Sequence, residues 1–172
     1  AATRQVRQLV LQNGQAGEWL LESDWRHPHV FEPGRYPAPV ASRYSGRYQF
    51  TRHYCAVLAD LKDGGEEFQC AQLIDRHPKV RQWVRNLDTA PCGFALPTSR
   101  GRFFADFVAE LVDGRVALLE YKGDHIQNPY QTEKHHVGAL WAQASAGKAV
   151  FGWLTRQQDG KSLAQQLDTV LA

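Results

Sequence analysis

The sequence lacks several features that would assign it to a class of protein at once. It has 172 residues and no methionine, even at its first position, which suggests a domain taken from a longer chain. Its three cysteines, Cys55, Cys70 and Cys92, include no CxxC pair. We therefore expect neither a disulfide framework nor a zinc ribbon, and a reducing cytoplasm fits this composition better.

Long apolar runs and a strong net charge are missing as well. No segment approaches the roughly 20 apolar residues that span a bilayer, and the first residues do not begin a signal peptide, so we expect no membrane partner. The net charge is only +2, so any binding of nucleic acid needs a local basic surface. The 43% of hydrophobic residues is ordinary for one globular domain of this length.

The spacing of apolar residues predicts an α/β domain behind an irregular N-terminal extension. Residues 1–60 are rich in proline and glycine and predict loops and short strands packed on the domain, which covers residues 61–172. Within the domain we expect a helix from Glu66 that is split or kinked at Pro78 and continues to Val84. Strands at 93–96, 102–111 and 115–122, a helix at 131–144, a strand at 150–154 and a helix at 162–171 capped by Ser162 follow.

Tyrosines and arginines alternate between Arg43 and Phe50. Such a segment either contacts nucleic acid through its rings and cations or covers the flank of the domain. The second interpretation is favoured.

The most informative segment places three charged residues in two apolar strands. Asp106 lies in the first strand, and Glu120 and Lys122 lie in the second. Charged side chains are rare in such strands unless they are paired or bind an ion, and two carboxylates beside an ammonium can hold a divalent cation next to a phosphodiester. The run 116–119 is apolar on both faces, which is typical of a strand covered on both sides. The alternative is a solvent-facing side on which Lys122 simply pairs with the acids.

The length of the loop between these strands decides whether the two acids meet. Side chains alternate along a strand, so Asp106 shares a face with Glu120 only if 106 lies opposite 120 and 108 opposite 118. A two-residue loop would instead place Asp106 opposite Tyr121. We predict a three-residue loop over 112–114 with Gly114 left-handed in a bulge, or else a bulge within one strand.

With Asp106 followed by Glu120-Tyr121-Lys122, the chain resembles the PD-(D/E)xK nuclease superfamily. That superfamily has a restriction-endonuclease-like core: a helix, a three-stranded antiparallel meander, a helix, a further strand and a helix. Its proline before the first acid is Ala105 here. Over residues 50–155 the chain is similar to the C-terminal endonuclease domain of type III restriction enzyme Res subunits and related helicase–nucleases, through segments 66–68, 83–86, 94–99, 104–108, 120–123, 133–134 and 138–141.

This resemblance implies a Mg²⁺-dependent endonuclease, with Mn²⁺ as a substitute, that hydrolyses phosphodiester bonds of double-stranded DNA. Asp106, Glu120 and the backbone carbonyl of Tyr121 would bind the metal. Lys122 would orient the attacking water or stabilise the charge that develops on the phosphate. The resemblance also implies a helicase motor in the same parent chain and, as in type III systems, a separate modification or recognition subunit.

Other residues have weaker claims to the site. Glu67, on the first predicted helix, is a candidate to bind the metal through water or to hold a second metal; Glu66 is nearly as well placed, and a solvated acidic helix start is the alternative. Gln131 and Lys134, at the start of the later helix, are candidates for contacts with DNA phosphates, with ordinary surface positions as the alternative.

The remaining metal-binding and nucleophilic residue types predict no site. Four histidines lack cysteine or acid partners at zinc-binding spacing, so we expect them to be exposed: His27, His29, His135 and His136. Cys70 is expected in the core, because no histidine is evidently placed to activate it.

Two alternatives to this function stay open. One is a catalytically silent nuclease fold that binds DNA or acts as a scaffold, against which the complete set of Asp106, Glu120 and Lys122 argues. The other is a stand-alone nuclease selective for DNA structure, against which the missing methionine and the resembling flanking segments argue.

Overall fold

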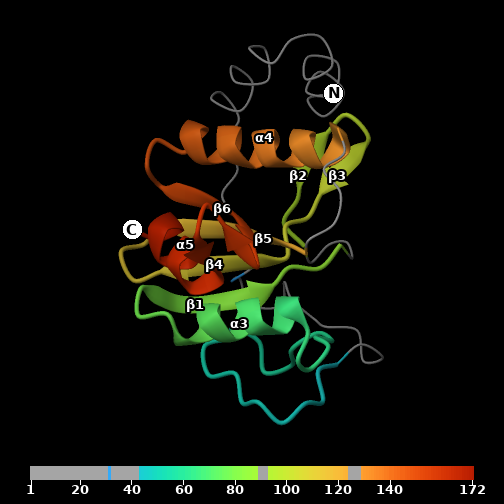
Figure 1. Cartoon of the computed structure of the whole chain (residues 1–172), viewed down its shortest axis with the longest axis vertical. Coiled ribbons are helices and arrows are strands. Elements are labelled where there is room, and N and C mark those ends of the chain that lie inside the picture. The colour runs from blue at the N-terminus through green and yellow to red at the C-terminus, as the bar shows by residue number, and fades with distance from the viewer. Residues whose placement is uncertain (1–30, 32–42, 89–92, 124–128) are drawn as a thin grey trace.

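The computed structural model describes residues 31, 43–88, 93–123 and 129–172, and in these ranges the chain is a mixed α/β fold with a mixed sheet and three helices (Figure 1). The helices are α3 (Glu66–Arg76), α4 (Pro129–Ala144) and α5 (Leu163–Val170). The four-stranded sheet contains β1 (Val80–Arg85), β4 (Phe107–Leu111), β5 (Val116–Lys122) and β6 (Ala149–Thr155). Two short hairpins are formed by β2 (Leu96–Thr98) with β3 (Gly101–Phe103), and by β7 (Gln157–Gln158) with β8 (Lys161–Ser162).

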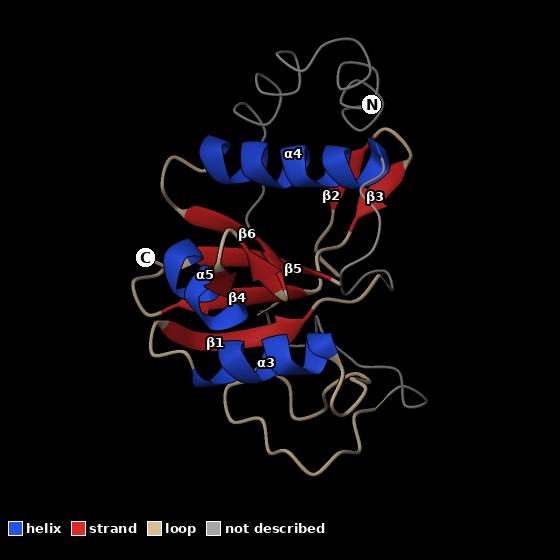
Figure 2. Ribbon diagram, in the orientation of Figure 1, coloured by secondary structure: helices blue, strands red, loops and turns tan. Residues whose placement is uncertain are grey.

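Helices cover both faces of the sheet, whose order is β1–β4–β5–β6 (Figure 2). The pairs β1/β4 and β4/β5 are antiparallel, whereas β5 and β6 are parallel. Leu118 of β5 packs with Val137 and Trp141 of α4 on one face, and Leu119 packs with residues of α3 and α5 on the other. The apolar run 116–119 is therefore buried on both sides, as the sequence predicts.

The residues after Pro78 form a strand, so the prediction of a continued helix is wrong. The chain leaves α3 through His77, which has an extended backbone (φ −67°, ψ 127°), because the residue before a proline avoids the helical region. Val80, Trp83 and Val84 are then buried in β1, which pairs with β4. This spacing fits a helix and a doubly covered strand equally well, and the pairing with β4 decides between them.

The meander has a different first strand from the predicted one. β1 takes the place that the sequence assigns to residues 93–96, and residues 96–98 pair instead with β3 in a separate hairpin. The predicted strand 102–111 is interrupted at residues 104–106, so it contributes both β3 and β4. The β2–β3 hairpin is thus an insertion between the first two strands of the meander.

The turn between β4 and β5 has the predicted length and conformation. Leu111 N donates to Arg115 O at 2.8 Å and Gly114 N donates to Leu111 O at 3.0 Å, which leaves a loop of residues 112–114. Gly114 has φ +87°, the left-handed conformation that favours glycine at this bulge. Because Val108 pairs with Leu118 and Phe107 with Leu119, the predicted register is confirmed.

The C-terminal elements agree closely with the sequence prediction. α4 and β6 cover the predicted helix and strand with small extensions at their ends. Ser162 caps α5 in a capping box, in which its side chain accepts from Gln165 N while Gln165 accepts from Ser162 N.

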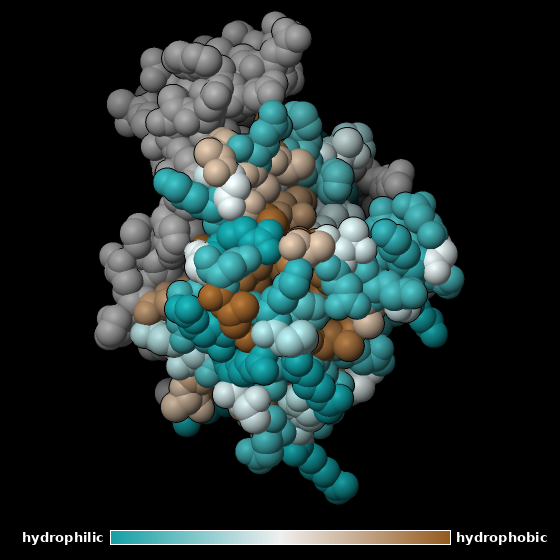
Figure 3. Space-filling model, turned by 90° about the vertical axis from the view of Figure 1, so that its left-hand side faces the viewer, coloured by the Kyte–Doolittle hydropathy of each residue, from teal (hydrophilic) through white to brown (hydrophobic). Residues whose placement is uncertain are grey.

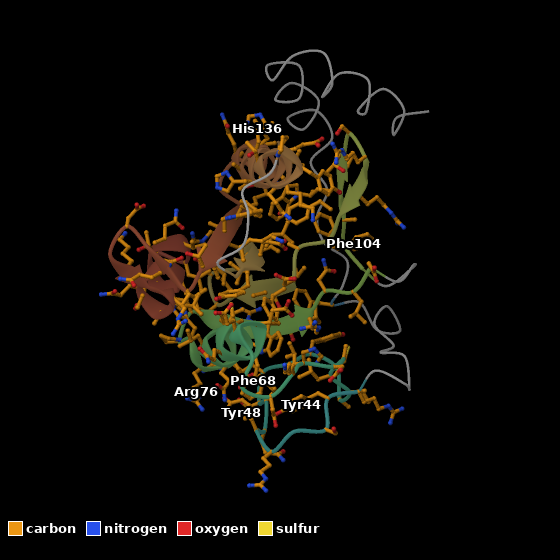
Figure 4. All side chains as sticks on the ribbon, turned by 45° about the vertical axis from the view of Figure 1, so that its right-hand side comes forward. Tyr44, Tyr48, Phe68, Arg76, Phe104 and His136 are labelled. Atoms are coloured by element: carbon orange, nitrogen blue, oxygen red, sulfur yellow. The ribbon has the colours of Figure 1, made fainter. Side chains whose placement is uncertain are left out.

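The aromatic segment before α3 covers the flank of the domain, as favoured above. Figure 4 shows Tyr44 and Tyr48 beside Phe68 of α3. The ring centroids of Tyr44 and Phe68 lie 5.9 Å apart, and Tyr44 donates to Asp63 at 2.7 Å. These rings therefore extend the core on the α3 face.

The helices and one face of the surface bear on membrane contact in the described part of the chain. No helix there is both long and apolar enough to cross a bilayer. Figure 3 shows one side of the molecule, where hydrophobic residues gather near the middle and hydrophilic residues surround them.

Candidate active site

The two acids of the hairpin meet where β4 and β5 separate. Phe107 and Leu119 are the last paired residues, so Asp106 and Glu120 come next to each other on the two strands. Asp106 N donates to Glu120 Oε2 at 3.1 Å, and Tyr121 N donates to Asp106 Oδ2 at 2.7 Å. Each carboxylate thus accepts a hydrogen bond from a backbone N–H of the opposite segment. These bonds replace the backbone–backbone hydrogen bonds of the β4/β5 pair, which ends at Phe107 and Leu119.

Asn86 holds the chain away from β5 at this point. Its Nδ2 donates to Phe94 O and Ala105 O at 2.8 Å each, and its Oδ1 accepts from Phe94 N at 2.9 Å. Its backbone N also donates to Asp106 O at 2.8 Å, which prolongs the β1–β4 ladder by one pair. The Ala105 carbonyl accepts from Asn86 Nδ2, and Tyr121 N donates to the Asp106 carboxylate instead of to that carbonyl. The sequence predictions above do not include Asn86, although a polar amide directly after an apolar strand is a usable signal.

The acids lie on the sheet face that α4 covers, and basic residues accompany them. Lys122 Nζ lies 2.5 Å from Glu120 Oε1, and the Lys122 side chain is 26% exposed against 3% for that of Glu120. Lys122 Nζ also lies 5.5 Å from the centre of the Trp153 ring on β6. The structure therefore brings Asp106, Glu120 and Lys122 together, with the lysine on the side nearer to solvent.

The pKa values of both acids are raised. Burial, followed by the charges of Glu120 and Glu67, raises the pKa of Asp106 to about 8. Burial also raises the pKa of Glu120 above its usual range, although Lys122 and Lys134 oppose this shift. Two buried carboxylates this close repel each other when both are ionised. Lys122 offsets part of this charge, and a bound cation would offset the rest.

The backbone N–H and C=O of Tyr121 both point towards the side on which Asp106 lies. Its N–H points to that carboxylate, and the N–H and C=O of one strand residue point towards the same neighbouring strand. The Tyr121 carbonyl is therefore directed to the opening between β4 and β5, where the predicted metal would lie.

Glu67 and Glu66 lie on α3, beside the same end of the sheet. Glu67 Oε2 is 3.0 Å from Arg85 Nη1, and the Glu67 charge raises the pKa of Asp106, so Glu67 lies near the acid pair without belonging to it. Both glutamates and Arg85 line a pocket of about 450 Å³, together with Tyr121 and Gly123. The structure thus places Glu67 as a charged neighbour of the pair, held by an arginine.

The two residues predicted to contact phosphates lie in the first turns of α4. Lys134 lies close enough to oppose the rise in the pKa of Glu120, and its Nζ is 4.9 Å from the centre of the Tyr130 ring. Gln131 is half-buried in the same region. The structure brings Lys134 to the edge of the site.

The remaining candidate ligands among the described residues are two surface histidines and a core cysteine. His135 and His136 are exposed, and Figure 4 shows His136 on the outer side of α4. His27 and His29 lie outside the described residues. Cys70 is fully buried, and burial, with the charges of Asp106 and Glu67, raises the pKa of its thiol, so it remains a core residue.

The residues at the site suit Mg²⁺ even though they form a sparse ligand set. Among the described residues, no three of His, Cys, Asp and Glu gather into a group that could hold a metal ion by themselves. Mg²⁺ is commonly bound by one or two carboxylates and keeps several waters. The two carboxylates, the carbonyl of Tyr121 and the unbalanced negative charge fit such an ion.

Comparison of the chain with protein-family models, with curated proteins and with solved structures returned no match.

Proposed function

We propose that the chain is a Mg²⁺-dependent DNA endonuclease domain of the PD-(D/E)xK type, part of a larger helicase–nuclease similar to type III restriction enzymes. The observation that carries the proposal is the reciprocal bonding of Asp106 and Glu120 where β4 and β5 part, with Lys122 on the same face. The element order helix, antiparallel meander, helix, parallel strand and helix supports it, because the resembling superfamily has that core.

In this proposal the residues of the chain have separate tasks. Asp106, Glu120 and the Tyr121 carbonyl would hold Mg²⁺, which when bound supplies charge neutralisation for the phosphate and a lower pKa for water. Lys122 orients the attacking water or stabilises the negative charge that grows on the phosphate oxygens. The Lys122–Glu120 ion pair keeps the ammonium at the mouth of the site before DNA arrives.

The wider setting follows from the resemblance. The motor would lie elsewhere in the parent chain, and a separate subunit would recognise the DNA sequence. The domain itself would then contact mainly phosphates of double-stranded DNA.

A DNA-binding module without catalysis is the competing function. The 2.5 Å contact of Lys122 with Glu120 favours it, because the lysine already neutralises one of the two acids. The two functions differ in metal binding, which the silent module does not need.

Plasmid cleavage with Mg²⁺ or Mn²⁺ tests the proposal. We expect nicking or linearisation by the unaltered chain, and a loss of at least about 100-fold in Asp106→Ala and Lys122→Ala, since each removes a group that acts in the transition state. Asp168→Ala and Lys161→Ala, at exposed positions outside the site, are matched controls that keep activity. Equal cleavage by all variants would overturn the assignment.

Calorimetry covers the case in which the domain does not cleave without its motor. We expect Mg²⁺ or Mn²⁺ to bind the unaltered chain and the Asp168→Ala control, and binding to be lost in Asp106→Ala. Absence of metal binding by the unaltered chain would favour the silent module.

A further inference from the structure

The β2–β3 hairpin is a short, two-stranded ribbon whose second strand ends three residues before Asp106. Its pairs are Leu96 with Phe103, Pro97 with Arg102 and Thr98 with Gly101, and its turn carries Arg100. Arg100 and Arg102 are both exposed. Figure 1 shows the hairpin beside the first turns of α4, and Figure 4 labels Phe104, which directly follows the hairpin and precedes Asp106 by two residues.

The hairpin is fixed to the body of the domain at both ends. Ser99 N and Ser99 Oγ donate to the two carboxylate oxygens of Glu133 on α4, at 2.5 and 2.7 Å. Leu96 and Phe103 are buried in the core on the α4 face. The arginines are therefore carried by a rigid element whose position relative to the acid pair is set by α4.

Cations and aromatic rings alternate along this edge. Arg102 lies 5.0 Å from the centre of the Phe104 ring, Arg100 lies 5.5 Å from that of Tyr130, and Lys134 lies 4.9 Å from the same tyrosine ring. Contacts of this kind hold long side chains in place and keep their charges outward. Glu133, the acid within this group, accepts from Ser99 and keeps its charge, but Arg100, Arg102 and Lys134 outnumber it, so the edge is positive on balance.

The basic edge leads into the site. Lys134 Nζ lies 5.4 Å from the centre of the Phe103 ring at the base of the hairpin, and Lys122 Nζ lies 2.5 Å from Glu120 Oε1. The positive charges of Arg100, Arg102, Lys134 and Lys122 thus run from the hairpin to the acid pair. With a net charge of only +2 for the whole chain, this local row is the kind of surface that binding of nucleic acid requires.

We propose that the β2–β3 hairpin binds duplex DNA beside the phosphate that the acid pair addresses, with Arg100 and Arg102 contacting phosphates at the edge of a groove. This inference rests on the proposed function. A two-stranded ribbon fits the major groove, and arginine forks match phosphate oxygens. Single-stranded DNA is less well matched, because such binding uses open ring faces, whereas Phe103 is buried and cations lie over Phe104 and Tyr130.

Fluorescence anisotropy with a short labelled duplex in EDTA tests the hairpin without cleavage. The unaltered chain is compared with the double variant Arg100→Ala/Arg102→Ala and with the matched double variant Arg76→Ala/Arg81→Ala, which removes two exposed arginines outside this edge. We expect the hairpin variant to bind about tenfold more weakly or worse at low salt. The slope of log K against log salt should fall by about 1.8, since each phosphate contact contributes about 0.9. The matched variant should bind like the unaltered chain.

The outcomes separate this inference from the nuclease assignment. The inference is overturned if the unaltered chain does not bind the duplex, if the two double variants behave alike, or if an unlabelled single strand competes better than the duplex. Asp106→Asn should bind the duplex as the unaltered chain does while losing cleavage. Binding that depends on the hairpin, with neither metal binding nor cleavage, would instead support the inference and refute the nuclease.

Discussion

Asp75 and the Asp106/Glu120 pair are buried carboxylate sites with opposite electrostatics. Asp75 is 2% exposed and accepts bonds from Thr51 N, Arg52 N and Trp83 Nε1. Burial raises its pKa, but these hydrogen bonds outweigh that effect and hold the pKa below its usual range. Asp106 instead faces Glu120, and burial with that neighbouring charge raises its pKa to about 8.

The difference lies in the hydrogen-bond donors that surround each site. Asp75 is surrounded by donors, so its ionised form stabilises the fold and ties the segment before α3 to α3 and β1. The pair at Asp106 has fewer donors for its two carboxylates, so ionising both should weaken the fold unless a cation binds. The metal site proposed above requires an imbalance of this kind.

Removing the Asp75 carboxylate should have the largest effect on stability. Asp75→Ala leaves several buried donors without an acceptor and should lower the free energy of unfolding by about 3 to 5 kcal/mol. Urea unfolding followed by circular dichroism measures this. Asp159→Asn, at an exposed turn position, should change stability by less than about 0.5 kcal/mol. A similarly small effect of Asp75→Ala would contradict the structural role of this residue.

Asn86 tests whether the opening between β4 and β5 is held in place. Asn86→Ala removes three side-chain hydrogen bonds of a residue that is 8% exposed, so we expect a loss of about 2 kcal/mol. We also expect weaker Mg²⁺ binding by calorimetry, because Asp106 loses its fixed position. Gln82→Ala, which removes a half-buried amide bonded to Glu110, should leave metal affinity unchanged. Unaltered metal affinity in Asn86→Ala would show that the acids are positioned without it.

The hairpin and its register could be predicted from the sequence because the information is local. Gly114 after Asp113 sets the loop, and alternation along the strands then puts Asp106 and Glu120 on one face. The capped helix at Ser162 is equally local, since the cap and its partner lie within four residues.

The errors arose where distant segments decide the structure. Val80, Trp83 and Val84 fit a helix as well as a strand, and only pairing with β4 selects the strand. The break at residues 104–106 depends on Asn86, about 20 residues earlier in the chain. Likewise, the ion pair of Glu67 with Arg85 joins α3 to β1, so spacing along one helix does not reveal it.

Asp106→Asn should stabilise the protein when no metal is present. The unfolded carboxyl group titrates near pH 3.9, whereas the folded one has a pKa of about 8. Between these values the folded chain holds a proton that the unfolded chain has lost, so its stability falls as pH rises. At pH 8 in EDTA we expect a gain of about 1 to 3 kcal/mol from Asp106→Asn, and a smaller gain at pH 5.

Thermal unfolding at the two pH values, with and without Mg²⁺, measures this gain. Mg²⁺ should raise the melting temperature of the unaltered chain and narrow its gap to Asp106→Asn. Asp75→Asn is the comparison with the opposite sign, since it removes a carboxylate whose folded pKa is lowered and should destabilise the protein above about pH 4. A destabilised Asp106→Asn at pH 8 would contradict the excess charge of the pair.

Glu67→Gln should have the smallest effect on stability, and it tests whether Glu67 belongs to the proposed metal site. Glu67 is 45% exposed and paired with Arg85, so its loss should change the free energy of unfolding by less than about 0.5 kcal/mol. Its charge contributes to the raised pKa of Asp106, so the pKa of Asp106 should fall in this variant. Mg²⁺ affinity should fall only a few-fold, because a neighbouring charge is lost but both acids remain. A loss as complete as in Asp106→Ala would instead make Glu67 a direct ligand and extend the site onto α3.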